Sequence, residues 1–298
     1  MGDKNILHML SPLKHISPFD ANMALDAGYD AVIPYAGVER GEVAALVQDA
    51  IFSRPPKLGV KTGFFFGGKD AILALDMLEL AKNAMVPPFA ASLFADPAGS
   101  FTTAAAMVTL VERTLRSKLG RGLGGLAVAV FGATGVVGFS SAIIAARQGA
   151  KVTLVGYDGP QRVQKAASEA SRRFEVRLDF ADGGTRENIE GILKDTEIVF
   201  SAARAGTRVL DRGQLEAASR LIIAADVNAV PPTGVEGLQT TGNGEPIAGT
   251  KVLAIGPLTI GQLKSRTEAG LFRQMIQAER PVLFDFRHAF ELASRLAI

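Results

Sequence analysis

The segment from Gly122 to Ala146 contains no charged side chain over 25 consecutive residues, and this constrains the fold more than any other feature. A run of that length could cross a bilayer as a single helix. Six glycines, however, divide the segment into an apolar run, a glycine-rich turn and a second apolar run. A central strand of a parallel sheet is buried on both faces and therefore shows no polar alternation. We predict a buried strand, loop and helix within a folded domain, and no membrane span.

The composition excludes several classes of protein. The 298 residues suggest about two domains. A formal net charge of +2 argues against a nucleic-acid-binding protein, because such proteins cluster Lys and Arg on one face. The absence of cysteine excludes a disulfide scaffold, a thiolate metal site and a cysteine nucleophile. The three histidines (His8, His15 and His288) lack metal-binding spacing, so we expect no metal. Without cysteine or a leader segment, the chain is expected to be cytoplasmic.

Apolar runs and helical patterns alternate along the whole chain, which predicts the α/β class with parallel sheets. The expected strands cover residues 6–10, 30–34, 61–67, 90–94, 126–131, 151–155, 176–178, 197–201, 221–225 and 251–255. The expected helices cover residues 22–27, 39–51, 70–85, 102–119, 135–148, 159–174, 186–193 and 211–218, and the stretch from residue 261 onward is mostly helical.

The glycine-rich turn has the form GxxGxxG, and it follows a strand and opens a helix. Its residues are Gly132, Ala133, Thr134, Gly135, Val136, Val137 and Gly138. Glycines allow a tight turn and a close approach of backbone to a pyrophosphate, and the helix N-terminus offers free N–H groups to it. This context predicts a dinucleotide site in a Rossmann-type doubly wound sheet. A glycine turn without ligand is the alternative.

The loop after the next strand indicates which dinucleotide is bound. Asp158 lies 20 residues beyond Gly138, where an acidic side chain binds the adenosine ribose and favours NAD. Arg162 and Lys165 follow at once, and Arg162 is suited to the extra phosphate of NADP. The sequence therefore predicts use of NAD or NADP. A turn or capping role for Asp158 and a solvated helix face for the two basic residues are the alternatives.

Polar and glycine residues follow other predicted strands, on the side where open α/β sheets bind ligands. For the dinucleotide we predict contributions from Asp226, Asn228 and Gly256; for a second ligand the candidates are Phe19, Asp20, Asp96, Ser100, Thr102, Thr103 and, further along, Lys264. Helix capping explains Asp, Ser and Thr at these places equally well. We expect an N-terminal α/β domain at residues 1–121, the Rossmann domain at 122–270, a cleft between them, and C-terminal helices at 271–298 that pack back on the first domain.

Four strings resemble the NAD(P)-dependent methylene-tetrahydromethanopterin dehydrogenases of methylotrophic bacteria. They are HMLSPLKHISPFD at 8–20, QDAIFSR at 48–54, FADPAGSFTT at 94–103 and DVNAVPP at 226–232. The resemblance spans nearly the whole chain. It implies hydride transfer from 5,10-methylene-tetrahydromethanopterin to NAD(P)+ during formaldehyde oxidation, a pterin-binding N-terminal domain, and a homo-oligomer built from trimers.

Hydride transfer of this kind leaves a cation delocalised over two nitrogens, so no general base is required. The enzyme must align donor and acceptor and supply fixed charges. We predict catalytic roles for Asp20 and for Lys264, whose match in the family supports its binding of a pterin carbonyl or its orienting of the substrate. Asp20 or Asp96 would face the developing cation or hold pterin N–H groups. Phe19 would pack on the pterin or phenyl ring, and Lys14, Arg54 and Lys69 would form a basic rim for an anionic tail.

Two further interpretations stay open. The layout is more distantly similar to bifunctional methylene-tetrahydrofolate dehydrogenase/cyclohydrolases, whose Tyr-x-x-x-Lys motif has its Lys replaced here, since Glu39 stands four residues after Tyr35. This replacement argues against cyclohydrolase activity. A methylene-tetrahydrofolate dehydrogenase or a shikimate-type dehydrogenase remains the first alternative. The second is a non-catalytic NAD(P)-sensing protein, which would not need Asp20, Asp96 and Lys264.

Overall fold

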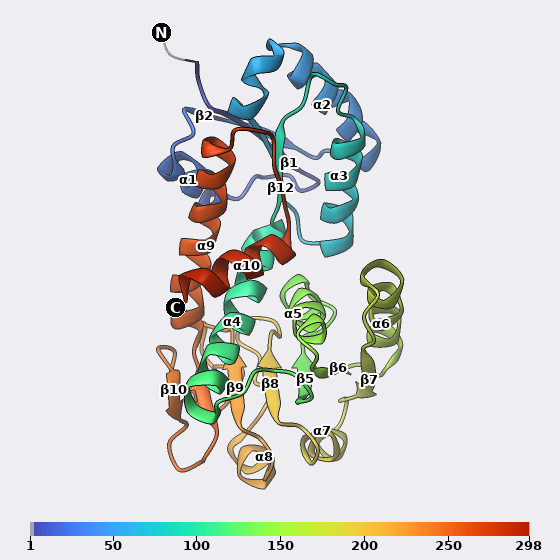
Figure 1. Ribbon diagram of the computed structural model, residues 1–298. Helices are drawn as coiled ribbons and strands as arrows, with labels where there is room; N and C mark the ends of the chain where they lie inside the picture. Colours follow the sequence, from blue (N-terminus) through green and yellow to red (C-terminus); the bar gives the residue numbers. More distant parts are fainter. Residues whose placement is uncertain (1–2, 298) are drawn as a thin grey trace. The chain divides into compact units, whose positions relative to one another are not determined.

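The computed structural model describes residues 3–297 (Figure 1). It contains two β-sheets, one in each of two units of the chain, and nearly all their strands are parallel. The first unit takes in the chain up to residue 102 and residues 265–292, and the second takes in residues 103–264 and the chain from 293 onward. The division falls inside three helices: α4 (Ser100–Leu119), α9 (Pro257–Gln277) and α10 (Phe286–Leu296). The predicted α/β class is confirmed.

The sheet of the first unit has the strand order β12-β4-β3-β1-β2, and all its strands are parallel. The strands are β1 (Ile6–Ser11), β2 (Ala31–Ala36), β3 (Thr62–Phe66), β4 (Ser92–Ala95) and β12 (Leu283–Phe284). The chain first moves from β1 outward to β2 and then returns to the other side of β1 to form β3. The carboxyl ends of β1 and β3 therefore flank a topological switch point, where open sheets bind ligands.

Helices cover both faces of this sheet. They are α1 (Pro18–Ala27), α2 (Val43–Phe52), α3 (Ala71–Asn83) and the second half of α9. Figure 1 shows α2 and α3 side by side. On the opposite face, Phe272 of α9 contacts Phe65 and Phe94, with ring centroids 5.6 and 5.3 Å apart. These buried aromatic contacts form the core under the strands that lead to the switch point.

The second sheet has the order β10-β11-β9-β8-β5-β6-β7, and its six parallel strands follow the Rossmann arrangement. The strands are β5 (Ala127–Phe131), β6 (Lys151–Gly156), β7 (Asp179–Asp182), β8 (Ile198–Ser201), β9 (Ile223–Asp226) and β11 (Leu253–Ile255), with β10 (Asn243–Pro246) antiparallel at the edge. The helices are α5 (Val136–Arg147), α6 (Gln161–Phe174), α7 (Arg186–Leu193) and α8 (Arg212–Ala217). The uncharged segment forms β5, the glycine loop and α5.

One strand prediction is wrong, and two strands were not predicted. Residues 176–178 were expected to form a strand, but they lie outside any strand, and β7 follows them. β7 is an edge strand that pairs only with β6, so its exposed acidic residues Asp179 and Asp182 are tolerated there, whereas the buried Val176 and Leu178 misled the prediction. Two strands were not predicted from the sequence. The residues of β10 include no apolar run, and β12 has only two residues.

None of the helices over residues 3–297 has the length and apolarity needed to cross a membrane.

Candidate functional site

The glycine loop lies at the carboxyl end of β5, next to the switch point between β5 and β8 of the second unit. Gly132 has φ of +72°, and a Cβ on it would lie 2.2 Å from the carbonyl oxygen of Ala202, which follows β8. A Cβ on Gly138 would lie 2.4 Å from the carbonyl oxygen of Gly132. Both positions therefore require glycine, because any side chain would push the loop away from the strands.

The N-terminus of α5 faces the same loop. Its N-cap residue, Gly135, has no side chain to cap the first amides, and its own N–H donates to the carbonyl of Gly132 at 3.0 Å. Thr134 and Gly135 are exposed, whereas Ala133 and Gly138 are buried; Val136 and Val137 are partly buried. The first amides of α5, which no side chain caps, and the helix dipole fit a pyrophosphate, so the residues present fit the predicted dinucleotide.

Three of the predicted dinucleotide residues come together at this loop. Arg162, in the first turn of α6, donates to Asp158 Oδ2 at 3.0 Å and to Thr134 Oγ1 at 3.4 Å. It also donates to the hydroxyl of Tyr157 at 3.4 Å. The hydrogen bond to Asp158, with that to Tyr157, raises the pKa of the Arg162 guanidinium. Asp158 and Arg162 are thus partners in one ion pair beside the glycine loop.

The loop after β9 is held by its own side chains. The carboxylate of Asp226 is completely buried and accepts hydrogen bonds from backbone amides, at distances of 2.7–3.2 Å. The donors are Asn228, Gly234 and Val235. Burial raises the pKa of Asp226 despite these bonds. Asn228 Oδ1 in turn accepts from the amide of Val230, whose side chain is half exposed. Asp226 and Asn228 thus fix this loop, and their direct contact with a dinucleotide stays a prediction.

Gly256 and Lys264 follow the last parallel strand, β11. A Cβ on Gly256 would lie 2.4 Å from the carbonyl oxygens of both Gln239 and Thr240, so this turn also requires glycine. Lys264 lies about two turns into α9, and only 8% of its surface is exposed. Lysine is rarely this buried in proteins, so a partner for its ammonium group is expected.

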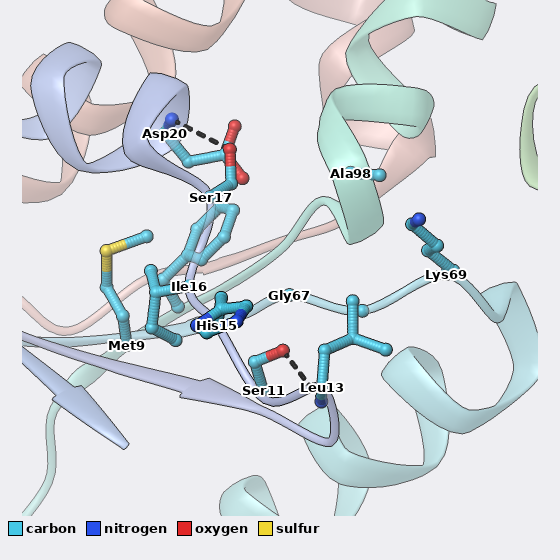
Figure 2. A pocket seen from close by; sticks show the side chains of 12 residues that line it. Met9, Ser11, Leu13, His15, Ile16, Ser17, Asp20, Gly67, Lys69 and Ala98 are labelled. Atoms are coloured by element: carbon cyan, nitrogen blue, oxygen red, sulfur yellow. Dashed lines mark hydrogen bonds between the residues drawn. The ribbon is translucent and has the colours of Figure 1, made fainter. Parts of the chain in front are cut away.

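The first unit contains a cavity of about 270 Å³ at the carboxyl ends of β1 and β3, the switch point of its sheet (Figure 2). It is lined by Met9, Ser11, Leu13, His15, Ile16, Ser17, Asp20, Phe65, Gly67, Gly68, Lys69 and Ala98. Asp20 enters from the first turn of α1, where its amide donates to Ser17 Oγ at 3.3 Å. Lys69 follows β3 and lies across the cavity from Asp20 in Figure 2. The cavity thus combines a carboxylate, a cation and apolar walls.

The predicted residues around this cavity differ in exposure. Asp20 is 2% exposed, whereas the neighbouring Phe19 is 48% exposed. Arg54 donates to the carbonyls of Lys4 and Lys61, at the amino-terminal edge of the sheet. It therefore lies at the edge opposite the cavity and does not line it, and its place in a basic rim for the substrate tail stays a prediction. Lys14 is exposed in the loop between β1 and α1.

The predicted residues after β4 form a helix cap. Asp96 is completely buried and accepts from the amide of Phe101 at 2.7 Å and from Thr102 Oγ1 at 2.5 Å. Ser100 and Thr102 are also buried, and Thr103 is partly buried. The capping alternative therefore describes Asp96 and Thr102, and substrate binding by this group stays a prediction. The turn nevertheless contributes to the cavity, because it carries Ala98, with φ of +54°, into the lining.

Part of the cavity lining was missed from the sequence: Ser11, Gly67 and Gly68. Ser11 ends β1 and accepts from the amide of Leu13 at 3.1 Å. Gly68 has φ of +124°. The available signal was a polar residue and two glycines directly after apolar runs, but it becomes informative only when β1 and β3 are known to be neighbours.

Among residues 3–297, no cluster of three or more His, Asp or Glu side chains is placed to hold a metal ion.

Comparison with solved structures supports the fold. Shikimate 5-dehydrogenase from Listeria monocytogenes is similar with a TM-score of 0.55 and 14% identity, covering 100% of this chain and 98% of that one. The 5-ketofructose reductase of Gluconobacter sp. strain CHM43 has a TM-score of 0.52 and 15% identity, covering 99% of both chains. At such low identity these likenesses concern the fold alone.

Sequence comparison goes further. The family described as "Methylene-tetrahydromethanopterin dehydrogenase, N-terminal" matches residues 18–98. The bifunctional protein MdtA of Methylorubrum extorquens is 32% identical over 94% of this chain and 95% of its own length. The NAD(P)-dependent methylenetetrahydromethanopterin dehydrogenase of the same organism is 47% identical over 99% of both chains. The resemblance seen in the sequence is thereby confirmed, and the chain belongs to the family of NAD(P)-dependent methylenetetrahydromethanopterin dehydrogenases.

Proposed function

We propose that this protein transfers a hydride from 5,10-methylene-tetrahydromethanopterin to NAD(P)+ and gives the methenyl cation and NAD(P)H, as a step of one-carbon oxidation. The observation that carries the proposal is the 47% identity over 99% of both chains to a relative whose name states this activity. The geometry supports it, because the first sheet has a cavity and the second a glycine loop at the switch point, where open α/β sheets bind ligands.

In the second unit, the glycine loop and the first turn of α5 would hold the pyrophosphate, and Asp158 would accept hydrogen bonds from the adenosine ribose. The bound nicotinamide supplies the hydride acceptor. Asp226 and Asn228 would position the loop after β9 and so exclude water from that side. Gly256 allows the turn before α9, the helix that carries Lys264.

In the first unit, the cavity would hold the pterin ring. A carboxylate such as Asp20 can accept two parallel hydrogen bonds from the adjacent ring N–H and amino group of a pterin. The same negative charge would stabilise the cation that forms as hydride leaves. Phe19 would cover the ring, and Lys69 would face the anionic tail. A separate proposal concerns Lys264 of the second unit, which is buried on α9 and would bind a pterin carbonyl oxygen.

The two ligands are assigned to different parts of the chain: the pterin to residues 1–121 and the dinucleotide to residues 122–270. A homo-oligomer built from trimers is inferred from the resemblance, and a cytoplasmic location from the absence of cysteine. Sedimentation of the purified protein would test the oligomer, and fractionation of the producing cells would test the location.

The direct test follows reduced nicotinamide by its ultraviolet absorbance. The protein is mixed with methylene-tetrahydromethanopterin, methylene-tetrahydrofolate or no C1 carrier, each with NAD+ and with NADP+. Turnover that depends on the tetrahydromethanopterin substrate supports the proposal. Faster turnover with the folate substrate supports the folate alternative, and no turnover with either supports the sensor alternative.

A pair of variants on one helix tests the pterin position. Asp20→Asn keeps the shape of the side chain but removes its charge, so kcat/KM for the pterin is expected to fall by about tenfold or more, with unchanged NAD(P) affinity. Asp26→Asn is the matched control, since Asp26 is exposed on the same helix and does not line the cavity. Equal activity of both variants would remove Asp20 from the site.

A further inference from the structure

We propose that Asp158 and Arg162 act as one coupled pair that allows a single ribose pocket to accept both NAD and NADP. The inference rests on the proposed use of NAD(P) and specifies which side chains decide between the two forms. Asp158 would serve the unphosphorylated ribose. Arg162 would leave the carboxylate to bind the 2′-phosphate.

The position of Arg162 supports this role. Its guanidinium bonds to Asp158 after β6 and also reaches Thr134 in the glycine loop, at 3.0 and 3.4 Å. It therefore bridges the two loops that enclose the adenosine ribose in this type of sheet. Its carbon Cζ lies 6.0 Å from the centroid of the exposed Tyr157 ring. The three contacts place a planar cation at the edge of the ribose position.

The ion pair is suited to exchange partners. The side chain of Arg162 is 56% exposed and that of Asp158 is 38% exposed. A pair this exposed is weak, because water screens it and competes for both groups. A 2′-phosphate carries more charge than a carboxylate and offers an arginine two parallel hydrogen bonds. A bound 2′-phosphate would therefore take the guanidinium from Asp158.

Asp158 is the fixed member of the pair, because the turn that carries it is tightly packed. A Cβ on Gly156 would lie 2.1 Å from the carbonyl oxygen of Gly159, and Gly159 itself has φ of +99°. Tyr157 and Gly159 are joined by an isolated bridge. The backbone at Asp158 therefore stays in place when NADP binds, and the guanidinium of Arg162 would offset the repulsion between the Asp158 carboxylate and the 2′-phosphate.

This arrangement predicts that the two residues do not act independently. With Arg162 bound to the 2′-phosphate, the attraction of the guanidinium outweighs the repulsion by Asp158, so the carboxylate has little effect on binding. Without Arg162, the same carboxylate repels the phosphate. Removing the charge of Asp158 should therefore improve binding of a 2′-phosphate more strongly when Arg162 is already absent.

The test measures binding of two nucleotides to the full chain by calorimetry, without any pterin. Adenosine 5′-monophosphate and adenosine 2′,5′-bisphosphate differ only in the 2′-phosphate. Arg162→Ala is expected to weaken the bisphosphate by about tenfold or more and the monophosphate by less than about threefold. Asp158→Asn is expected to weaken the monophosphate but not the bisphosphate. Arg172→Ala is the matched control, because it removes a paired arginine near the other end of α6.

The double variant decides the coupling. Relative to Arg162→Ala alone, adding Asp158→Asn should raise affinity for the bisphosphate at least about threefold more than the same change raises it in the unaltered protein. Independent effects of the two changes would overturn the proposal, as would equal losses of both nucleotides in Arg162→Ala. Since no pterin is used, these results do not depend on whether the protein oxidises methylene-tetrahydromethanopterin.

Discussion

The Oγ1 hydroxyl of Thr102 donates a 2.5 Å hydrogen bond to Oδ2 of Asp96, and both side chains are completely buried. This contact lies at the junction of β4 and α4. It shows how a residue that resembles a ligand-binding carboxylate in the sequence can be used to begin a helix.

The first prediction concerns this cap. Thr102→Val keeps the shape of the side chain but removes its hydroxyl, and leaves one acceptor of a buried carboxylate without this donor. We expect the free energy of unfolding to fall by about 1–3 kcal/mol. Urea denaturation followed by circular dichroism measures it. Thr185→Val is a comparison at the exposed cap of α7, where a smaller loss is expected; similar losses would contradict the importance of burial.

The second prediction concerns the glycine loop. Gly138→Ala would place a Cβ 2.4 Å from the carbonyl oxygen of Gly132 and so displace the turn from β5. NAD(P) affinity is expected to fall by about tenfold or more, because the amides no longer converge on the pyrophosphate. Titration of the nucleotide by calorimetry measures this. Gly191→Ala in α7 meets nothing within 4 Å and should leave affinity intact. If Gly138→Ala bound NAD(P) normally, the close approach would not matter for binding.

The third prediction concerns Lys264, which is buried on α9. Lys264→Met preserves most of the side-chain volume but removes the ammonium group. We expect kcat/KM for the pterin to fall by about tenfold or more while NAD(P) affinity changes little. Steady-state kinetics and nucleotide titration separate the two quantities. Thermal denaturation checks that the variant is folded, and wild-type turnover by a folded variant would exclude Lys264 from catalysis.

The fourth prediction is a pH dependence of stability that arises at His8. Burial, and secondly the charge of Arg54, lowers the pKa of His8 from 6.5 to about 4. The unfolded chain therefore binds a proton at this position before the folded chain does. The contribution of neutral His8 to the free energy of unfolding is complete above pH 6.5. It is lost as the pH falls toward 4, by about 3 kcal/mol in total.

His8→Gln should flatten this part of the stability curve, as measured by urea denaturation at a series of pH values. His15→Gln is the matched control, because His15 is exposed. Removing the imidazole also loses its contacts with Phe64 and Tyr35, so the variant is expected to be less stable at neutral pH. An unchanged slope in His8→Gln would mean that other groups cause the acid sensitivity.

Local pattern was sufficient to predict the elements that build the proposed dinucleotide site. Gly132 follows β5 and Gly138 lies in the first turn of α5, as expected, because the constraints on such a loop come from neighbouring residues in the sequence. The same holds for the partners Asp158 and Arg162, which are one helical turn apart. The hydrogen bond from Arg162 to Thr134 was not predictable, since it joins loops of different strands.

Long-range pairing explains what the sequence did not reveal. The cavity of the first unit depends on β3 returning to lie beside β1, which brings Gly67 next to Ser11. No periodicity within either strand specifies that neighbour. The bounds of β7 were misjudged and β12 was missed for the same reason. Each of these segments is a strand because it pairs with a strand from elsewhere in the chain, β6 and β4 respectively. Arg54 follows α2 and precedes β3, so the order of the elements along the chain places it at the amino-terminal edge of the sheet, opposite the cavity.

The pairing of β12 with β4 has a consequence for the order in which the protein forms during synthesis. Leu283 and Phe284 pair with Leu93 and Phe94, almost two hundred residues earlier in the chain. All of residues 103–264 are therefore synthesised before the strand that completes the first sheet is available. Until then the edge of β4 presents unpaired backbone groups, which attract other strands. A nascent chain halted before residue 280 should need a chaperone at that edge.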